Sequence, residues 1–188
     1  DIKKKIFSEI DSLSSEHALI VSNTSALRIT ALAAATRRPE KVAGMHFFNP
    51  PQLMKLVEVV RGLRTSDKTV EKVMEVVVKL EKIPVLCKDT PGFVANRIGI
   101  LALLEGIRLY EQGVASAEDI DKAMKFGYNW PMGPLELADL IGLDILLNIT
   151  ESLYRETGNQ SYIPPIILKQ LVNAGFLGRK TQRGFYEY

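Results

Sequence analysis

The stretch GMHFFNPPQLMKLVEVV, residues 44–60, holds two short apolar runs on either side of a proline pair. The runs 42–48 and 55–60 are rich in β-branched, aromatic and other apolar residues, and they predict two β-strands. The proline pair ends the first strand, because proline fixes φ and has no backbone N–H to donate. Each run contains one residue that does not suit a buried strand, His46 in the first and Glu58 in the second.

Helical and strand patterns alternate around this stretch in the first half of the chain. An amphipathic helix is indicated by the spacing of Ile2, Ile6, Ile10 and Leu13. The expected elements are a helix at 2–14, a strand at 18–21, a helix at 26–36, the strands at 42–48 and 55–60, a helix that begins at Thr65 or Ser66, and a strand at 83–87. In the helix after Ser66, the residues expected to face the core are Val70, Val73, Met74, Val77 and Leu80. The alternation predicts an α/β sheet covered on both faces.

From residue 89 onward the pattern is helical. The expected helices are 94–112, which ends at Gly113, one capped by Ser116 and Asp119, one that begins at Pro134, and those at 143–156 and 164–173. Large apolar faces are formed by Ile98, Leu101, Leu104 and Leu109, and by Leu140, Leu143, Leu146 and Leu147. They exceed what a domain of this size is expected to bury, which predicts a homodimer through this half. We expect an α/β domain, residues 1–88, followed by an all-helical domain, residues 89–188.

A glycine-rich phosphate-binding turn is absent from the sequence. No G-x-G-x-x-G motif occurs in the 188 residues, and the chain opens on a helical pattern without a strand before it. In a doubly wound fold the first strand and its glycine turn come before the first helix. The first domain is therefore predicted to be the second half of a Rossmann-type fold, and the 188 residues to be part of a longer protein.

Composition limits the classes of partner. The formal net charge of +2 is too balanced to favour nucleic acid or an anionic membrane as the main partner. The single cysteine, Cys87, excludes an internal disulfide and a cysteine-cluster metal site, and no metal is expected. No apolar run approaches the roughly 18 residues that cross a bilayer, and the first residues lack a signal-peptide core. These features predict a protein of the cytoplasm or of another reducing compartment.

His46 and Glu58 are candidates for chemistry if their strands are neighbours. A carboxylate on one imidazole nitrogen fixes the tautomer and stabilises the imidazolium, so that the other nitrogen can take a proton. The pair would then be a general base with an orienting group, as in a catalytic triad. The alternatives are structural: His46 as an inert buried aromatic neighbour, and Glu58 as an edge-strand residue that faces water.

Several other residues have both a functional and a structural explanation. Ser25 and Asn96 could hydrogen-bond a small oxygen atom of a substrate, but Ser25 also suits a helix N-cap and Asn96 an exposed helix position. Asn49 is either a site residue or a turn residue before proline. Cys87 suits a small buried hydrophobe, and His17 has no evident partner.

Four segments together carry a resemblance to a known family. They are SNTSALRIT (22–30), GMHFFNPPQLMKLVEVV (44–60), KDTPGFVANRI (88–98) and MGPLELADLIGLD (132–144). Over nearly all of its length the chain resembles L-3-hydroxyacyl-CoA dehydrogenase, the NAD-dependent oxidoreductase of fatty-acid β-oxidation and of the related 3-hydroxybutyryl-CoA route. The resemblance implies NAD as cofactor, an acyl-CoA substrate, and a Rossmann-type domain followed by a helical domain that binds substrate and forms a homodimer.

The resemblance also implies roles for individual residues. His46 matches the base that removes the proton of the 3-hydroxyl group, and Glu58 matches its carboxylate partner. Ser25 and Asn96 match residues that hold the substrate oxygen, and Ser25 also matches a cofactor position. Asn49 matches a residue beside the nicotinamide end of the cofactor.

Two lysines complete the implied cofactor contacts, Lys3 in the first helix and Lys180 in GRKTQRGFYEY. The implied activity is NAD-dependent oxidation of (S)-3-hydroxyacyl-CoA to 3-ketoacyl-CoA. One alternative is a non-catalytic dimerisation and substrate-docking fragment of such an enzyme, which the absent glycine motif favours for residues 1–188. Another is a dehydrogenase of similar build that acts on sugars or hydroxy acids without CoA.

Overall fold

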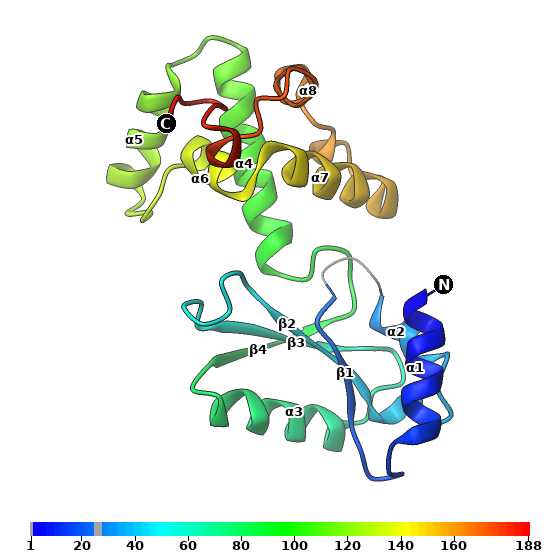
Figure 1. The fold of residues 1–188 in the computed structure, drawn as a ribbon. Helices are drawn as coiled ribbons and strands as arrows, with labels where there is room; N and C mark the ends of the chain where they lie inside the picture. Colours follow the sequence, from blue (N-terminus) through cyan, green and yellow to red (C-terminus); the bar gives the residue numbers. More distant parts are fainter. Residues whose placement is uncertain (1, 25–27) are drawn as a thin grey trace. The chain divides into compact units, whose positions relative to one another are not determined.

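Four strands form one mixed sheet in the computed structural model, which describes residues 2–24 and 28–188. They are β1 (Ile20–Ser22), β2 (Val42–Phe47), β3 (Leu56–Arg61) and β4 (Ile83–Lys88), and they lie in that order across the sheet (Figure 1). β1 pairs with β2 in parallel, β2 with β3 antiparallel, and β3 with β4 in parallel. The strands predicted at 42–48, 55–60 and 83–87 are confirmed.

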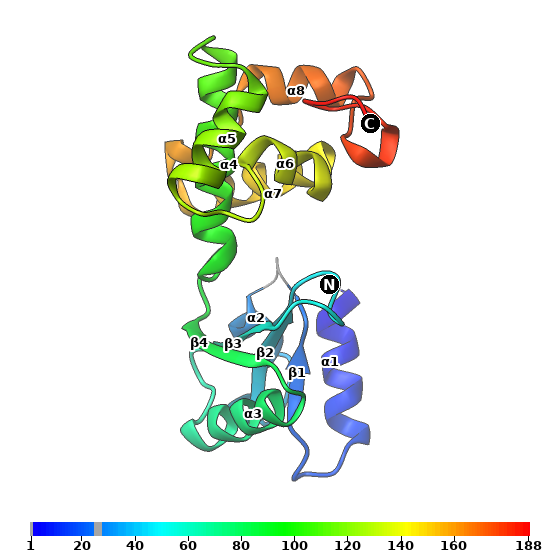
Figure 2. The same cartoon turned by 90° about the vertical axis from the view of Figure 1, so that its left-hand side faces the viewer.

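Helices cover both faces of this sheet (Figures 1 and 2). α1 (Ile2–Leu13) and α2 (Ile29–Ala33) pack on one face, and α3 (Asp67–Lys79) packs on the other. The first face buries Phe7, Ile20, Ile29, Leu32, Ala33, Val42, Val60 and Phe93. The second face buries Ala43, Met45, Val57, Val59, Val73 and Val77. The two cores are separate because successive residues of a strand point to opposite faces.

This alternation puts His46 and Glu58 on the face that α1 and α2 cover. Glu58 lies two residues before Val60 on β3, so its side chain shares the face of Val60. In the antiparallel ladder, β2 places His46 directly opposite Glu58. The close packing here requires Gly44, since a Cβ at this position would lie 2.6 Å from the Val60 Cβ and 3.0 Å from the Ile29 Cδ1.

Two elements differ in extent from the sequence prediction. The strand expected at 18–21 is found at Ile20–Ser22. Of the helix expected at 26–36, residues 26–27 lie outside the described residues, and the described part is helical at Ile29–Ala33. The N-cap of this helix, α2, is Arg28, which makes no side-chain capping hydrogen bond. Instead, the Asp89 carboxylate accepts the first two N–H groups of α2 at 3.0 and 2.7 Å and so fixes where the helix begins. A 3-10 turn, η1 (Pro39–Lys41), then leads into β2.

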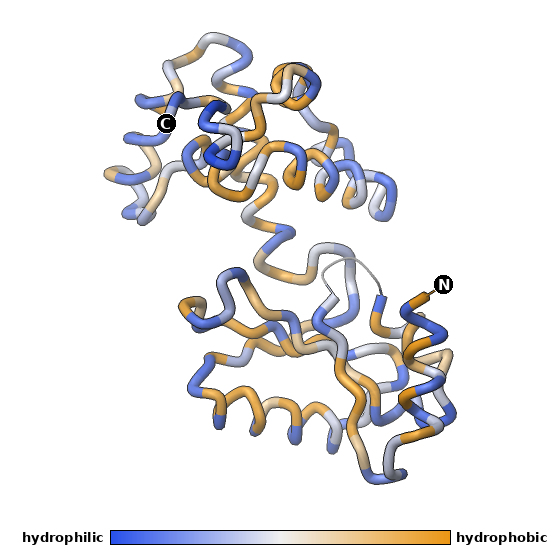
Figure 3. Tube along the Cα trace, in the orientation of Figure 1, coloured by the Kyte–Doolittle hydropathy of each residue, from blue (hydrophilic) through white to orange (hydrophobic). Residues whose placement is uncertain are grey.

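α3 begins where the sequence predicts. Ser66 is its N-cap and accepts the Thr69 N–H at 3.2 Å, whereas Thr65 is buried and donates to a backbone carbonyl of β2. Hydrophobic and hydrophilic positions alternate along the helix (Figure 3). Val70, Val73 and Val77 are buried, as predicted. Leu80 was expected to face the core but is 50% exposed, because it is the C-cap and the next residue, Glu81, turns away with a φ of 58°.

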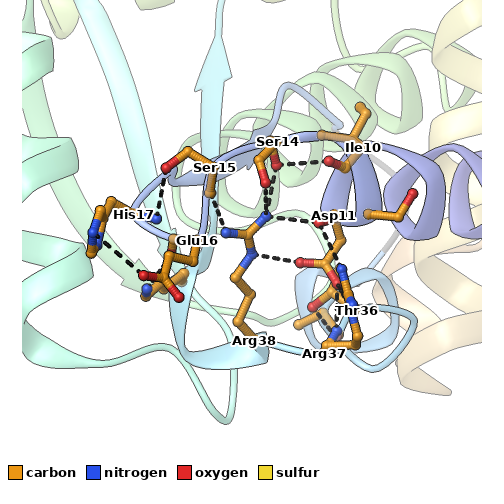
Figure 4. A network of polar contacts seen from close by, with 12 residues as sticks. Ile10, Asp11, Ser14, Ser15, Glu16, His17, Thr36, Arg37 and Arg38 are labelled. Atoms are coloured by element: carbon orange, nitrogen blue, oxygen red, sulfur yellow. Dashed lines mark hydrogen bonds and ion pairs between the residues drawn. The ribbon is translucent and has the colours of Figure 1, made fainter.

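A network of polar contacts fastens the end of α1 to the segment before β2 (Figure 4). The buried carboxylate of Asp11 accepts the Arg37 backbone N–H at 2.8 Å, Arg37 Nε at 3.2 Å and Arg38 Nε at 2.6 Å. The Arg38 guanidinium also donates to the carbonyl of Asp11, in the last turn of α1, and to the carbonyls of Ser14 and Ser15 just beyond the helix. The Arg37 backbone N–H, followed by the guanidinium groups, lowers the pKa of Asp11 below its ordinary value of 3.8.

We expect Asp11→Asn to lose stability in a pH-dependent way. Because the folded-state pKa of Asp11 is lowered, its carboxylate stabilises the fold fully above the unfolded-state pKa of about 4 and progressively less below it. The difference in urea midpoint between wild type and Asp11→Asn, followed by circular dichroism, should be constant from neutral pH to about pH 4 and then shrink. Glu9→Gln, an exposed change on the same helix, is the control. A difference that grows on acidification would contradict the role of Asp11.

The residues after Val94 form a second compact unit, Ala95–Tyr188, distinct from the sheet unit Asp1–Val94. Its helices are α4 (Ala95–Glu111), α5 (Ala117–Gly127), α6 (Pro134–Ile141), α7 (Leu143–Thr157) and α8 (Ile166–Asn173), with the 3-10 turns η2 (Gln160–Tyr162) and η3 (Arg179–Thr181). Ser116 caps α5 and Pro134 begins α6, as predicted. The fold class is therefore confirmed: a partial Rossmann-like sheet followed by a helical unit. No helix within residues 2–24 and 28–188 is long and apolar enough to cross a membrane.

Candidate active site

His46 and Glu58 are in direct contact within the sheet unit. His46 Nδ1 lies 2.9 Å from Glu58 Oε2, and the two side chains are 7% and 1% exposed. The antiparallel register of β2 and β3 produces the contact, because it places the two residues opposite each other on one face. The alternative in which Glu58 faces water is therefore excluded.

The second carboxylate oxygen of Glu58 is also hydrogen-bonded. The backbone N–H of Val94, beyond the end of β4, donates to Glu58 Oε1 at 2.9 Å. A buried carboxylate needs such donors, because it has lost the water that would otherwise stabilise its charge. The two contacts hold Glu58 in one orientation, with Oε2 presented to His46.

Aromatic rings flank the imidazole of His46. The ring centroid of Phe48 lies 4.8 Å from that of His46, and the centroid of Phe93 lies 5.4 Å away in an edge-on arrangement. Nδ1 is engaged by Glu58, whereas Nε2 has no hydrogen-bond partner among residues 2–24 and 28–188. An imidazole held by a carboxylate on Nδ1 can accept a proton on Nε2 and release it again.

The edge of the sheet that carries His46 suits a ligand. β1 and β2 are parallel, so their carboxyl ends lie at the same edge, and His46 is the next-to-last residue of β2. Asn23, just after β1, accepts the Phe47 backbone N–H on its Oδ1 at 2.9 Å and joins the two ends. Open α/β sheets bind ligands at the carboxyl ends of their strands, so a small molecule could meet His46 here.

Two of the predicted cofactor residues belong to this edge. The Nζ of Lys3, in α1, lies 3.5 Å from Oγ1 of Thr24, which is two residues beyond β1. Asn49 is exposed and lies two residues beyond β2. Ser25, predicted to bind both substrate and cofactor, lies outside the described residues. The topology thus brings Lys3 and Asn49 to the same edge as His46.

The other two predicted site residues belong to the helical unit. Asn96 is the second residue of α4 and is partly exposed. Lys180, in η3, forms an ion pair with Asp144 near the start of α7. A hydrogen bond from the Lys180 ammonium lowers the pKa of Asp144 below its ordinary value. Lys180 therefore has a structural partner within its own unit.

Cys87 is a structural residue near this site. It is partly buried and packs against the core that α1 and α2 cover. Burial, with a further contribution from the carboxylates of Glu58 and Asp89, raises the pKa of the thiol to about 12. The thiol is therefore protonated at neutral pH and is a poor nucleophile, which agrees with its interpretation as a small hydrophobe.

Two glycines of the sheet unit lie close to a helix but do not form a phosphate-binding cradle. Pyrophosphate binding in a doubly wound fold depends on a glycine turn at a helix N-terminus. Gly44 faces Val60 and Ile29, and Gly62 faces Thr65 and Ile29, so protein atoms occupy the space that an open cradle would leave. The G-x-G-x-x-G motif likewise does not occur in the 188 residues.

Three contributors to the site were not predicted from the sequence. Val94 donates its backbone N–H to Glu58, and Asn23 joins the ends of β1 and β2. Asp89 caps α2, the role considered for Ser25. Asn23 lies in SNTS and Asp89 in KDTPGF, two segments in which polar turn residues cluster. This clustering is a sequence feature from which both residues could have been predicted. A backbone donor such as Val94 leaves no signal in a side-chain pattern.

Two family models match almost the whole chain. Residues 1–90 match the NAD binding domain of 3-hydroxyacyl-CoA dehydrogenase, and residues 92–188 match the C-terminal domain of 3-hydroxyacyl-CoA dehydrogenase. The first match contains the His46–Glu58 pair, and the second contains every helix from α4 to α8.

Curated proteins and solved structures give the same result. A 3-hydroxybutyryl-CoA dehydrogenase of Clostridioides difficile is 50% identical over 188 residues, which make up 100% of this chain and 67% of the relative. A mitochondrial hydroxyacyl-coenzyme A dehydrogenase of Homo sapiens is 47% identical, with 100% of this chain and 60% of the relative covered. The crystal structure of an (S)-3-hydroxybutyryl-CoA dehydrogenase from Ralstonia eutropha matches with a TM-score of 0.96 and 48% identity, covering 100% of this chain and 66% of that one.

The chain spans 60% to 67% of the length of these two curated relatives. Within that span the likeness includes both the sheet unit and the helical unit. The chain belongs to the 3-hydroxyacyl-CoA dehydrogenase family.

Proposed function

We propose that this chain carries the acid–base site of an enzyme that oxidises (S)-3-hydroxyacyl-CoA to 3-ketoacyl-CoA with NAD, in fatty-acid β-oxidation or the butyryl-CoA pathway. The observation that supports the proposal is the buried contact of 2.9 Å between His46 Nδ1 and Glu58 Oε2, near the carboxyl ends of β1 and β2, where open α/β sheets bind ligands. Such a pair would suit many reactions that need a general base. Membership of the 3-hydroxyacyl-CoA dehydrogenase family supports a 3-hydroxyacyl-CoA as the substrate of this reaction.

In the proposed reaction His46 removes a proton from the substrate. The 3-hydroxyl group gives its proton to His46 Nε2, and the electron pair of the broken O–H bond forms the second bond of the C3 carbonyl. NAD, when bound, supplies the acceptor for the hydride that leaves C3. The Glu58 carboxylate stabilises the imidazolium through Nδ1, and the imidazolium returns the proton in the reverse direction.

The remaining site residues are proposed to position the two reactants. Ser25 and Asn96 would hydrogen-bond the C3 oxygen of the substrate. Lys3, Ser25, Asn49 and Lys180 would contact the cofactor. The placement of Lys3 and Asn49 at the His46 edge of the sheet supports their part of this assignment. The ion pair of Lys180 with Asp144 favours a structural role for that residue beside the proposed one.

A non-catalytic role for these 188 residues alone is the second candidate. Two observations favour it: the sequence has no glycine motif for the cofactor phosphates, and the chain spans 60% to 67% of its curated relatives. In this case residues 1–188 would fold and associate but would not oxidise a substrate.

A dehydrogenase that acts on sugars or hydroxy acids without CoA is the third candidate, because it could use the same acid–base pair.

The test uses a completed chimera, in which residues 1–188 are joined to the part of the Clostridioides difficile relative that lies outside the match. The chimera should reduce NAD with (S)-3-hydroxybutyryl-CoA but not with the (R) enantiomer or with free 3-hydroxybutyrate. His46→Gln should abolish this activity. His17→Gln changes an 85% exposed histidine of the same unit and should not affect it. Equal activity of the two variants would contradict the proposal, and a preference for the free acid would favour the dehydrogenase without CoA.

We further propose that the helical unit forms a homodimer. Three leucines that the sequence suggested for this surface, Leu104, Leu143 and Leu146, are instead buried in the core of the unit. Ile98 and Leu140 are 68% and 49% exposed, and these exposed apolar side chains are the support for association. Sedimentation of residues 1–188 at tens of micromolar should show a dimer, and a monomer would count against it.

A further inference from the structure

The turn from Thr90 to Val94, which follows β4, holds two successive residues in the left-handed region. Gly92 has a φ of 74° and Phe93 a φ of 45°. Glycine adopts such angles freely, but for a bulky aromatic residue they are uncommon and unfavourable. Backbone strain of this kind persists only where surrounding contacts enforce it, and it concentrates at functional sites.

Contacts before this turn and within it hold its backbone in place. Before it, the Asp89 N–H donates to the Arg61 carbonyl of β3 at 3.0 Å, and the Asp89 carboxylate accepts two N–H groups of α2. Within it, the Phe93 N–H donates to the Thr90 carbonyl at 3.1 Å. The Phe93 side chain is 5% exposed and belongs to the core that α1 and α2 cover. The backbone at Phe93 is therefore fixed by its surroundings.

The backbone angles of Phe93 determine where the next N–H group points. The Val94 N–H donates to Glu58 Oε1 at 2.9 Å, and the other oxygen of Glu58 contacts His46 Nδ1, also at 2.9 Å. A negative φ at Phe93 would swing the following peptide group and take the Val94 N–H away from Glu58. The Phe93 ring also meets the His46 ring edge-on, a contact that glycine at this position could not make.

We propose that Phe93 is a positioning residue for the His46–Glu58 pair and acts through its left-handed backbone and the Val94 N–H. The Val94 donor holds one carboxylate oxygen of Glu58, so the other oxygen is the one presented to the imidazole. The catalytic consequence rests on the proposed function, whereas the positioning can be measured without activity.

The test compares Phe93→Gly with Phe93→Ala in residues 1–188. Both changes remove the ring and leave nearly the same space, but only glycine adopts a left-handed φ without strain. NMR can observe slow hydrogen exchange of the Val94 amide and the hydrogen-bonded Nδ1 proton of His46. Both signals should persist in Phe93→Gly. In Phe93→Ala the Val94 amide should exchange about tenfold faster, which corresponds to ~1.4 kcal/mol, and the Nδ1 proton signal should weaken.

If Phe93 acted only through its packing, the two variants would follow the opposite order of amide exchange rates. Phe93→Gly leaves the slightly larger cavity, so it would then be the less stable variant and would exchange faster. That order, or unchanged signals in Phe93→Ala, would overturn the proposal. If either variant fails to fold, Phe93→Asn against Phe93→Leu repeats the comparison with side chains of similar shape, because asparagine tolerates a left-handed φ better. Asparagine should then preserve both signals better than leucine.

Kinetics of the completed chimera separate this proposal from the proposed function. Phe93→Ala should lower kcat about tenfold more than Phe93→Gly, with similar KM values, because positioning of the base matters in the transition state. Equal kcat values for the two variants would overturn the catalytic consequence. A different outcome is that the NMR signals of the two variants follow the predicted order, but the chimera remains active without His46. This result would contradict the proposed function and leave the positioning of Glu58 by Phe93 intact.

Discussion

Glu58→Gln is expected to lower the kcat of the completed chimera about 10²–10⁴-fold, the range for loss of acid–base assistance. Glutamine has the size of glutamate but carries a donor on one side of its amide. The Val94 N–H requires an acceptor, so the amide oxygen should turn toward Val94 and the NH₂ group toward His46 Nδ1. The imidazole would then accept at Nδ1 and carry its proton on Nε2, where it cannot take the proton of the substrate.

KM should change much less than kcat in this variant, because the lost interaction acts mainly in the transition state. Steady-state kinetics with (S)-3-hydroxybutyryl-CoA measures both constants. Glu75→Gln, an exposed change on α3, is the matched control and should behave as wild type. A Glu58→Gln variant whose kcat stays within about threefold of wild type would remove Glu58 from the mechanism.

Residues 1–188 alone are expected to bind NADH at millimolar strength or not measurably. The contacts proposed for this chain involve Lys3, Ser25, Asn49 and Lys180, and none of them replaces a glycine turn at a helix N-terminus. Each loss of about 1.4 kcal/mol weakens binding tenfold, and the pyrophosphate and adenosine contacts together provide several such factors. The chain should also show no dehydrogenase activity by itself, although its helical unit has its own core and should fold.

Calorimetry can test this expectation by titrating NADH into residues 1–188 and into the completed chimera. Binding should be much tighter in the chimera, because it regains the missing phosphate contacts. Micromolar binding to residues 1–188 would contradict the expectation. The cofactor would then need a site that these residues form in another way, such as one completed by a second subunit.

The parts of the fold that depend on local signals could be predicted from the sequence. The proline pair after β2, the N-cap Ser66 and the helix starts at Ser116 and Pro134 all act within a few residues. The contact between His46 and Glu58 could be predicted only on the condition that their strands are neighbours. Strand pairing and register are tertiary properties, and the structure provides them.

The features that could not be predicted depend on distant contacts or on backbone geometry. The first turn of α2 is fixed by Asp89, 60 residues along the chain. The apolar pattern of α3 continues to Leu80, but the helix has ended there and the chain turns away at Glu81. Apolar residues such as Leu143 are equally suited to a core and to a dimer interface, and only packing shows that Leu143 is in the core.

A crystal structure of the completed chimera with a 3-ketoacyl-CoA tests most directly whether His46 is the base. The C3 carbonyl oxygen should lie within about 3.2 Å of His46 Nε2, the reach of a general base, while Nδ1 keeps its contact with Glu58. The same oxygen should accept a hydrogen bond from Ser25 or Asn96. A complex with the thioester carbonyl over His46, and with the C3 oxygen bound elsewhere, would show that His46 is not the base for this reaction.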